Sequence, residues 1–158
     1  MIKLDEVVST QTRREFCAGC SKAAGLLALG AVTACGGSPT SPSSNSTPLT
    51  SVSATVSGRV VSIAVGSGAL ATTGGMAIAQ TNLGSFLITR TAPTSATVLT
   101  ATCTHEGCTV TGFSGSQFVC PCHGSTFSTS GTVVQGPANR ALQSFAAQIN
   151  GEVLTFTA

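Results

Sequence analysis

The chain has 158 residues, of which 8% are charged, and its formal net charge at pH 7 is +2. From residue 52 onward, a length that suffices for one small domain, the charged side chains are Arg59, Arg90, Arg140, Glu106 and Glu152. So few cations form no basic patch, and this excludes a surface of the kind that binds nucleic acid.

The first recognisable pattern is an export signal. Arg13 and Arg14, followed by Phe16, resemble the twin-arginine signature, and a stretch rich in Ala, Leu and Gly follows at residues 23–34. Because twin-arginine export carries folded proteins that already hold their cofactors, the signal is compatible with a metal-binding domain downstream. We expect residues 1–34 to be this signal.

The end of the apolar stretch indicates how the protein is anchored. Val32-Thr33-Ala34-Cys35-Gly36 resembles a lipobox, and cleavage before Cys35 would leave its thiol to carry lipid. The alternative is an uncleaved N-terminal anchor that spans the membrane. A spanning helix needs about 20 predominantly apolar residues, and Lys22 interrupts the run. We therefore favour a lipid anchor at Cys35.

The next segment has the composition of a tether. Residues 36–51 read GGSPTSPSSNSTPLTS and contain no charged residue. Such a sequence buries too little apolar surface to fold by itself. We expect a flexible Ser/Pro/Thr tether over residues 35–51, followed by a folded domain over residues 52–158.

Short β-prone runs recur through this domain, separated by Gly-rich turns. Apolar residues alternate from Val61 to Val65, and further runs cover 76–80, 86–91, 97–101, 144–149 and 152–156. The last two flank Asn150-Gly151, a strong hairpin signal. The pattern predicts an all-β fold, a small antiparallel sandwich or barrel.

Two segments carry the chemistry, Cys103-Thr104-His105-Glu106-Gly107-Cys108 and Cys120-Pro121-Cys122-His123-Gly124-Ser125. Together they contain both histidines and four of the seven cysteines of the chain. Residues 109–119 read as a hairpin around Ser114-Gly115-Ser116, which would bring the two segments side by side. Two Cys and two His suit either a tetrahedral zinc site or a mixed-ligand [2Fe–2S] cluster. The zinc interpretation leaves two cysteines without a role.

The two segments resemble the paired cluster-binding loops of Rieske iron–sulfur proteins, C-T-H-x-G-C and C-P-C-H-G-S, at every defining position. The resemblance implies a Rieske-like fold with a cluster-binding subdomain. It also implies that Cys103, His105, Cys120 and His123 are the ligands of one [2Fe–2S] cluster, and that Cys108 and Cys122 form the disulfide found in cytochrome bc-type members. Such a disulfide needs an oxidising compartment, which agrees with the export signal.

The same resemblance implies roles for residues around the ligands. In high-potential members a Ser after the His-Gly donates to a cluster sulfur and a Tyr two residues later donates to a ligand sulfur. Ser125 keeps the first donor, whereas Phe127 has no hydroxyl, so we expect a redox potential below that of quinol-oxidising members and above that of ferredoxins.

Gly136 and Pro137 resemble the loop that covers the cluster, although Gly-Pro also marks ordinary turns. Glu106 stands where bc-complex members carry Leu, and its charge opposes entry into an apolar quinol pocket.

These features predict an exported one-electron carrier on the extracytoplasmic, periplasmic face of the membrane, lipid-anchored or N-terminally anchored. It would be a free carrier or a subunit of a quinol-oxidising cytochrome bc-type complex, with cytochrome b- or c-type redox partners and quinol as a candidate partner. The first alternative is the small Rieske subunit of an exported molybdenum oxidase such as arsenite oxidase. The second is a zinc-stabilised binding module without redox activity. We expect an electron-transfer subunit rather than an autonomous enzyme, because both histidines are committed to the metal and no Ser-His-Asp grouping is possible.

Overall fold

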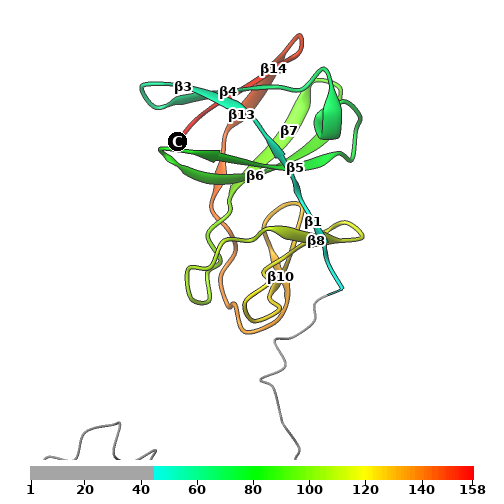
Figure 1. Ribbon diagram of the computed structural model, residues 1–158, viewed down its shortest axis with the longest axis vertical. Helices are drawn as coiled ribbons and strands as arrows, with labels where there is room; N and C mark the ends of the chain where they lie inside the picture. Colours follow the sequence, from blue (N-terminus) through cyan, green and yellow to red (C-terminus); the bar gives the residue numbers. More distant parts are fainter. Residues whose placement is uncertain (1–44) are drawn as a thin grey trace, which may run out of the picture. The chain divides into compact units, whose positions relative to one another are not determined.

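The computed structural model describes residues 45–158 (Figure 1). The expected export signal with Arg13 and Arg14, the expected lipidation site Cys35 and most of the expected tether lie outside the described residues. Within residues 45–158 there is no helix of the length and hydropathy that a membrane span requires.

Strands make up nearly all of the secondary structure. They are β1 (Thr47–Pro48), β2 (Thr50–Val52), β3 (Ala54–Ser57), β4 (Val60–Ala64), β5 (Met76–Thr81), β6 (Gly84–Ala92), β7 (Ser95–Thr100), β8 (Gly112–Ser114), β9 (Gln117–Val119), β10 (Thr126–Ser128), β11 (Val133–Gln135), β12 (Ser144–Phe145), β13 (Ala147–Asn150) and β14 (Val153–Thr157). A single 3₁₀ turn, Gly68–Leu70, is the only helical element in this part of the chain. The prediction of an all-β fold is confirmed.

The strands form three sheets, which lie one above another in Figure 1. The outer sheet has the order β13-β14-β4-β3, the central sheet β12-β7-β6-β5-β2, and the loop-bearing sheet β1-β8-β9-β10-β11. Neighbouring strands are antiparallel except for β2 and β5, which pair in parallel. The architecture therefore agrees with the antiparallel sandwich expected from the sequence, with a further small sheet on its lower side.

The central sheet is covered on both faces, and its sequence reflects this. In β6, Phe86 and Ile88 pack into the core shared with the outer sheet, whereas Leu87 between them packs into the core shared with the loop-bearing sheet. Strands buried on both faces read as continuous apolar runs rather than as alternating ones. By contrast, β4 alternates, because Val61 and Ile63 are buried while Val60 lies exposed on the outer face.

The last predicted strand is divided between two sheets. Residues 144–149 were expected to form one strand, but β12 pairs with β7 of the central sheet and β13 pairs with β14 of the outer sheet. The chain therefore crosses between sheets at Ala146. The following hairpin loop lies one residue later than Asn150-Gly151 suggests, because Asn150 pairs with Val153 and the loop consists of Gly151 and Glu152.

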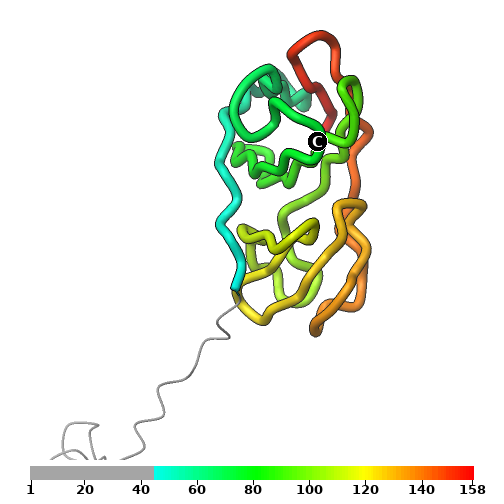
Figure 2. Tube along the Cα trace, turned by 90° about the vertical axis from the view of Figure 1, so that its right-hand side faces the viewer, coloured from blue at the N-terminus to red at the C-terminus, as the bar shows by residue number. Residues whose placement is uncertain are grey.

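The end of the expected tether belongs to the fold. We call residues 46–52 the N-terminal strap. Its strand β1 pairs with β8 and its strand β2 pairs with β5, so it links two sheets, and Figure 2 shows it in cyan along one side of the molecule. Leu49 lies between the two strands, is 8% exposed and donates its amide to Thr111 O at 2.8 Å. The tether prediction is thus wrong for residues 47–51, because pairing with existing strand edges orders a segment that lacks an apolar pattern of its own.

Candidate metal centre

The two Cys/His segments are loops with the same backbone arrangement. In the first, Cys103 N donates to Cys108 O at 2.8 Å and Gly107 N donates to Cys103 O at 2.9 Å. In the second, Cys120 N donates to Ser125 O at 2.8 Å and Gly124 N donates to Cys120 O at 3.1 Å. Each loop thus folds back on its first cysteine.

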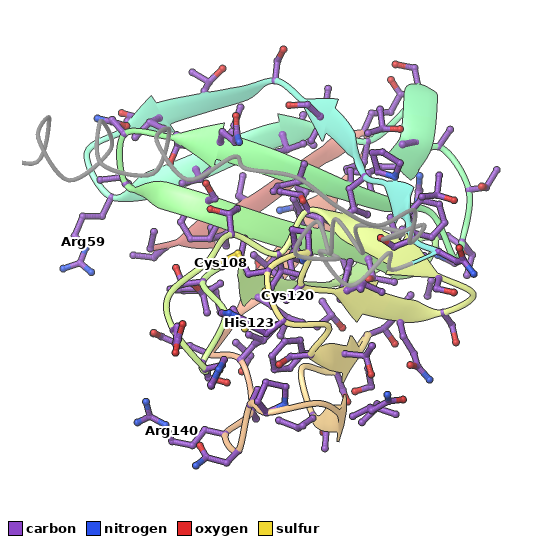
Figure 3. All side chains as sticks on the ribbon, turned by 60° about the horizontal axis from the view of Figure 1, so that its bottom comes forward. Arg59, Cys108, Cys120, His123 and Arg140 are labelled. Carbon is purple, nitrogen blue, oxygen red and sulfur yellow. A yellow bond between two sulfur atoms is a disulfide. The ribbon has the colours of Figure 1, made fainter. Side chains whose placement is uncertain are left out.

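The positions of the two loops follow from the loop-bearing sheet. The first loop precedes β8, the second joins β9 to β10, and β8 and β9 form the hairpin expected around Gly115. This hairpin brings the loops together as the sequence predicted. Figure 3 shows Cys108, Cys120 and His123 gathered in one place, with Arg59 on a separate part of the surface.

The four candidate ligands form an inner sulfur pair and an outer nitrogen pair. Cys103 and Cys120 are 3% and 1% exposed and belong to the core below the loops. The side chains of His105 and His123 are 29% and 48% exposed. Their rings meet edge to face, with centroids 5.0 Å apart and an angle of 86° between the planes. The structure therefore brings two thiols and two imidazoles to one site, with the imidazoles towards solvent.

Burial and mutual contact govern the protonation of the inner pair. Burial raises the pKa of the Cys120 thiol, and a hydrogen bond with Cys103 raises it further, although the backbone amides of Cys122 and His123 act in the opposite direction. A metal that binds sulfur replaces these protons and gains two thiolate ligands at once. This donor set of two thiols and two imidazoles fits a mixed-ligand [2Fe–2S] cluster.

A disulfide joins the two loops. Cys108 and Cys122 are bonded through sulfur, with their Cα atoms 6.5 Å apart. Bonds of this kind between loops limit the conformations of the unfolded chain and hold the loops together in the folded one. The pairing is the one that the sequence resemblance implied.

Glu106 reaches both imidazoles. Its carboxylate oxygens lie 3.6 Å from His105 Nε2 and 3.8 Å from His123 Nδ1, and its side chain is 63% exposed. The sequence places Glu106 beside His105, but only the fold shows that the second loop brings His123 to the same carboxylate.

A third loop, residues 136–140, packs against the site. Ser125 is fully buried and its Oγ accepts a hydrogen bond from Ala138 N at 3.1 Å. A Cβ atom at Gly136, whose φ is +103°, would lie 2.5 Å from the Ser125 Cα. Gly136 therefore packs directly against the backbone of the second Cys/His loop at Gly124 and Ser125.

Sequence reasoning missed two contacts of this third loop. Ala138 contributes its backbone amide to Ser125, and Arg140 contributes its carbonyl oxygen, which accepts from Thr104 Oγ1 at 2.6 Å. No sequence signal marks such positions, because backbone groups make these contacts. Beside the first loop lies an open hollow of about 650 Å³, lined by residues that include His105, Glu106, Arg140 and Gln143.

Comparison with known proteins agrees with this geometry. A family model described as "Rieske [2Fe-2S] domain" matches residues 62–146. One similar protein is the cytochrome b6-f complex iron-sulfur subunit of Synechococcus sp. (strain JA-3-3Ab), which is 43% identical over 60 residues that cover 37% of this chain and 35% of that subunit. Another is the cytochrome b6-f complex iron-sulfur subunit of Prochlorococcus marinus (strain AS9601), which is 56% identical over 45 residues that cover 28% of this chain and 25% of that subunit. The chain thus matches only about a third or less of the length of these relatives.

Among solved structures, the chain is similar to the crystal structure of the cyanobacterial plasma membrane Rieske protein PetC3 from Synechocystis PCC 6803. The sequence identity is 33%, the TM-score is 0.47, and the match covers 53% of this chain and 87% of that one.

Proposed function

The chain belongs to the family of Rieske [2Fe-2S] domains, and on that basis we propose that it transfers single electrons through a cluster held by Cys103, His105, Cys120 and His123. The observation that carries this proposal is the burial of two adjacent thiols beneath two exposed imidazoles, in loops joined by a disulfide. Family membership supports a [2Fe–2S] cluster over the zinc alternative.

The protein's own residues would set the properties of the site. When bound, the cluster takes up and releases one electron, at a potential that its two imidazole ligands raise above that of plant-type ferredoxins. The buried cysteines keep water from the inner side, while the histidines present the outer side to a redox partner. The Oγ of Ser125 already accepts from Ala138 N, which leaves its hydroxyl proton to be donated towards a cluster sulfur.

We further propose that this electron transfer takes place in or beside a quinol-oxidising complex of the cytochrome bc type. The names of the similar proteins, subunits of cytochrome b6-f complexes, support this assignment over the molybdenum-oxidase alternative. Attachment to the extracytoplasmic face of the membrane through a lipid on Cys35, after export by the twin-arginine signal at Arg13 and Arg14, fits such a partner. Direct insertion into an apolar quinol pocket is opposed by the exposed carboxylate of Glu106.

The cluster assignment is tested by metal analysis and EPR on the purified full chain. We expect two iron ions per chain and, after reduction, a spectrum with nitrogen couplings from two imidazoles. His105→Ala and His123→Ala should each abolish these couplings, and Gln148→Ala, an exposed position on β13, is the matched control that keeps them. Bound zinc with no EPR signal would contradict the proposal.

The partner assignment needs a separate measurement. Quinol analogues should change the EPR spectrum only when the chain is reconstituted with its cytochrome partner, because Glu106 disfavours quinol binding to the isolated chain. Glu106→Leu removes the charge and should strengthen the effect of the analogue. An analogue that shifts the spectrum of the isolated wild-type chain would show that Glu106 does not oppose quinol.

A further inference from the structure

Three cysteine sulfurs crowd together at the junction of the two loops. The Sγ atoms of Cys108, Cys120 and Cys122 all lie within 4.8 Å of one another. Two of them form the disulfide, and the third belongs to a free, buried cysteine. Cys103, the other free cysteine among the described residues, does not belong to this group of three.

The backbone holds the free sulfur against the disulfide. Cys120 is fixed by hydrogen bonds at both its amide and its carbonyl, to Ser125 O and from Gly124 N, and only Pro121 separates it from Cys122. On the other loop, the amide of Cys103 fixes Cys108 by donating to its carbonyl oxygen at 2.8 Å. These contacts are made by protein atoms alone, so they persist in a chain without a cluster.

We propose that Cys120 exchanges with the Cys108–Cys122 disulfide whenever the chain lacks its cluster. The Cys120 sulfur attacks Cys108 or Cys122; a new S–S bond forms as the old one breaks, and the displaced sulfur takes up the proton that Cys120 gives up. One disulfide is present before and after, so the step needs neither an oxidant nor a reductant. The inference rests on the proposed function in taking Cys120 as a cluster ligand.

The exchange would prevent Cys120 from binding iron. A Cys120 that is bonded to Cys108 or Cys122 has no thiolate left for iron, so a chain that acquires its disulfide before its cluster becomes unable to bind the cluster. With the cluster bound, the same sulfur is occupied by metal and cannot attack. Insertion of the cluster before the disulfide forms would avoid this competition for Cys120.

The test removes the cluster and maps the disulfides. The full chain, loaded with its cluster, is treated with an iron chelator without oxygen or any other oxidant; free thiols are then alkylated and the bonded peptides identified by mass spectrometry. We expect peptides in which Cys120 is linked to Cys108 or Cys122, with the displaced cysteine alkylated, and we expect none of them in the loaded chain. An intact Cys108–Cys122 bond with Cys120 fully alkylated would overturn the proposal.

Two variants show whether the disulfide exchanges with the nearby Cys120 in particular or with any free cysteine. Cys103→Ser and Cys120→Ser each remove one proposed ligand by the same chemical change, but only the second removes the attacking sulfur. Exchanged peptides should persist in the first and disappear in the second. In the cluster-free wild type, links of Cys120 should exceed links of Cys103 by about tenfold, because a sulfur held in place has a far higher effective concentration. Equal links of both cysteines would indicate an unfolded chain and refute the proposal, whereas the EPR spectrum of the loaded chain tests the proposed function independently.

Discussion

Phe127 and Phe118 pack in the core on the cysteine side of the candidate metal centre. The two residues face each other across β9 and β10, are fully buried, and belong to the core that contains Cys103 and Cys120. The two thiols proposed as ligands therefore lie in an apolar setting, while the imidazoles lie at the surface. A change at either phenylalanine acts on the cluster through the sulfur side.

Phe127→Tyr is expected to raise the redox potential. The family resemblance implies that a hydroxyl at this position donates to a ligand sulfur, and a hydrogen bond to a thiolate stabilises the reduced cluster. The midpoint potential is measured by redox titration followed by EPR. Phe118→Tyr makes the same change at the neighbouring buried ring and serves as the control. A potential that stays the same or falls in Phe127→Tyr would count against this role.

Gly136→Ala is expected to loosen the third loop. A Cβ there meets the Ser125 backbone, and the φ of +103° adds strain, so we expect a loss of about 2 kcal/mol or more in the free energy of unfolding together with loss of iron. Gly115→Ala is the matched control, because Gly115 has a φ of +58° with open space around it, and it should cost about 1 kcal/mol and keep the iron. Denaturant unfolding and iron analysis provide the two readouts. Equal effects of both variants would mean that strain alone, rather than contact with Ser125, governs the loop.

At the scale of elements, the N-terminal strap joins the loop-bearing sheet to the central sheet. Leu49→Ala should destabilise the domain by about 2 kcal/mol, the lower end for a buried leucine, because the residue lies at a sheet edge. The neighbouring exposed Thr50→Ala is the control and should change stability little. Thermal unfolding of the loaded chain measures both. If Leu49→Ala behaves like its control, the strap does not contribute to the core.

The strap also shows where sequence reasoning fails. The strands with apolar alternation, such as that from Val61 to Val65, and the hairpin around Gly115 were predictable, because the local pattern matches what the tertiary structure buries. The approach of the two Cys/His loops was predictable from that hairpin and their disulfide from the resemblance, whereas the ligand set stays a prediction. The strap was not, because its two short strands form only where β8 and β5 offer unpaired edges, and Leu49 is the one apolar residue that the core takes from residues 46–51. Contacts that depend on backbone atoms, such as that of Ala138 with Ser125, have no sequence signal at all.

At the scale of the whole molecule, charged side chains are few, and one of them is bound to main-chain oxygens of the same chain. Among residues 45–158, Arg90 donates from its guanidinium to the main-chain oxygens of residues 65, 70, 71, 92 and 93. This leaves Arg59, Arg140, Glu106 and Glu152 as the remaining charged side chains. The long-range electrostatic attraction that residues 45–158 exert on a partner is therefore weak.

The rate of electron transfer to a partner should depend little on salt. Association that is steered by charge slows steeply as ionic strength rises, whereas two cations and two anions without a patch of one sign give little to screen. We expect stopped-flow rates with a cytochrome acceptor to change by less than about threefold between low and physiological ionic strength. A steep decrease would show that a charged patch outside residues 45–158, or on the partner, controls docking.

The strap has a consequence for any shortened version of the chain. A protein that begins at residue 52, the boundary that composition suggests, would lose β1 and all of β2 except Val52 and leave β8 and β5 with free hydrogen-bonding edges. Open edges of this kind recruit strands from neighbouring molecules. The residues that link the sheets thus also cover edges open to association, and a fragment that begins before Ser46 should self-associate less than one that begins at residue 52.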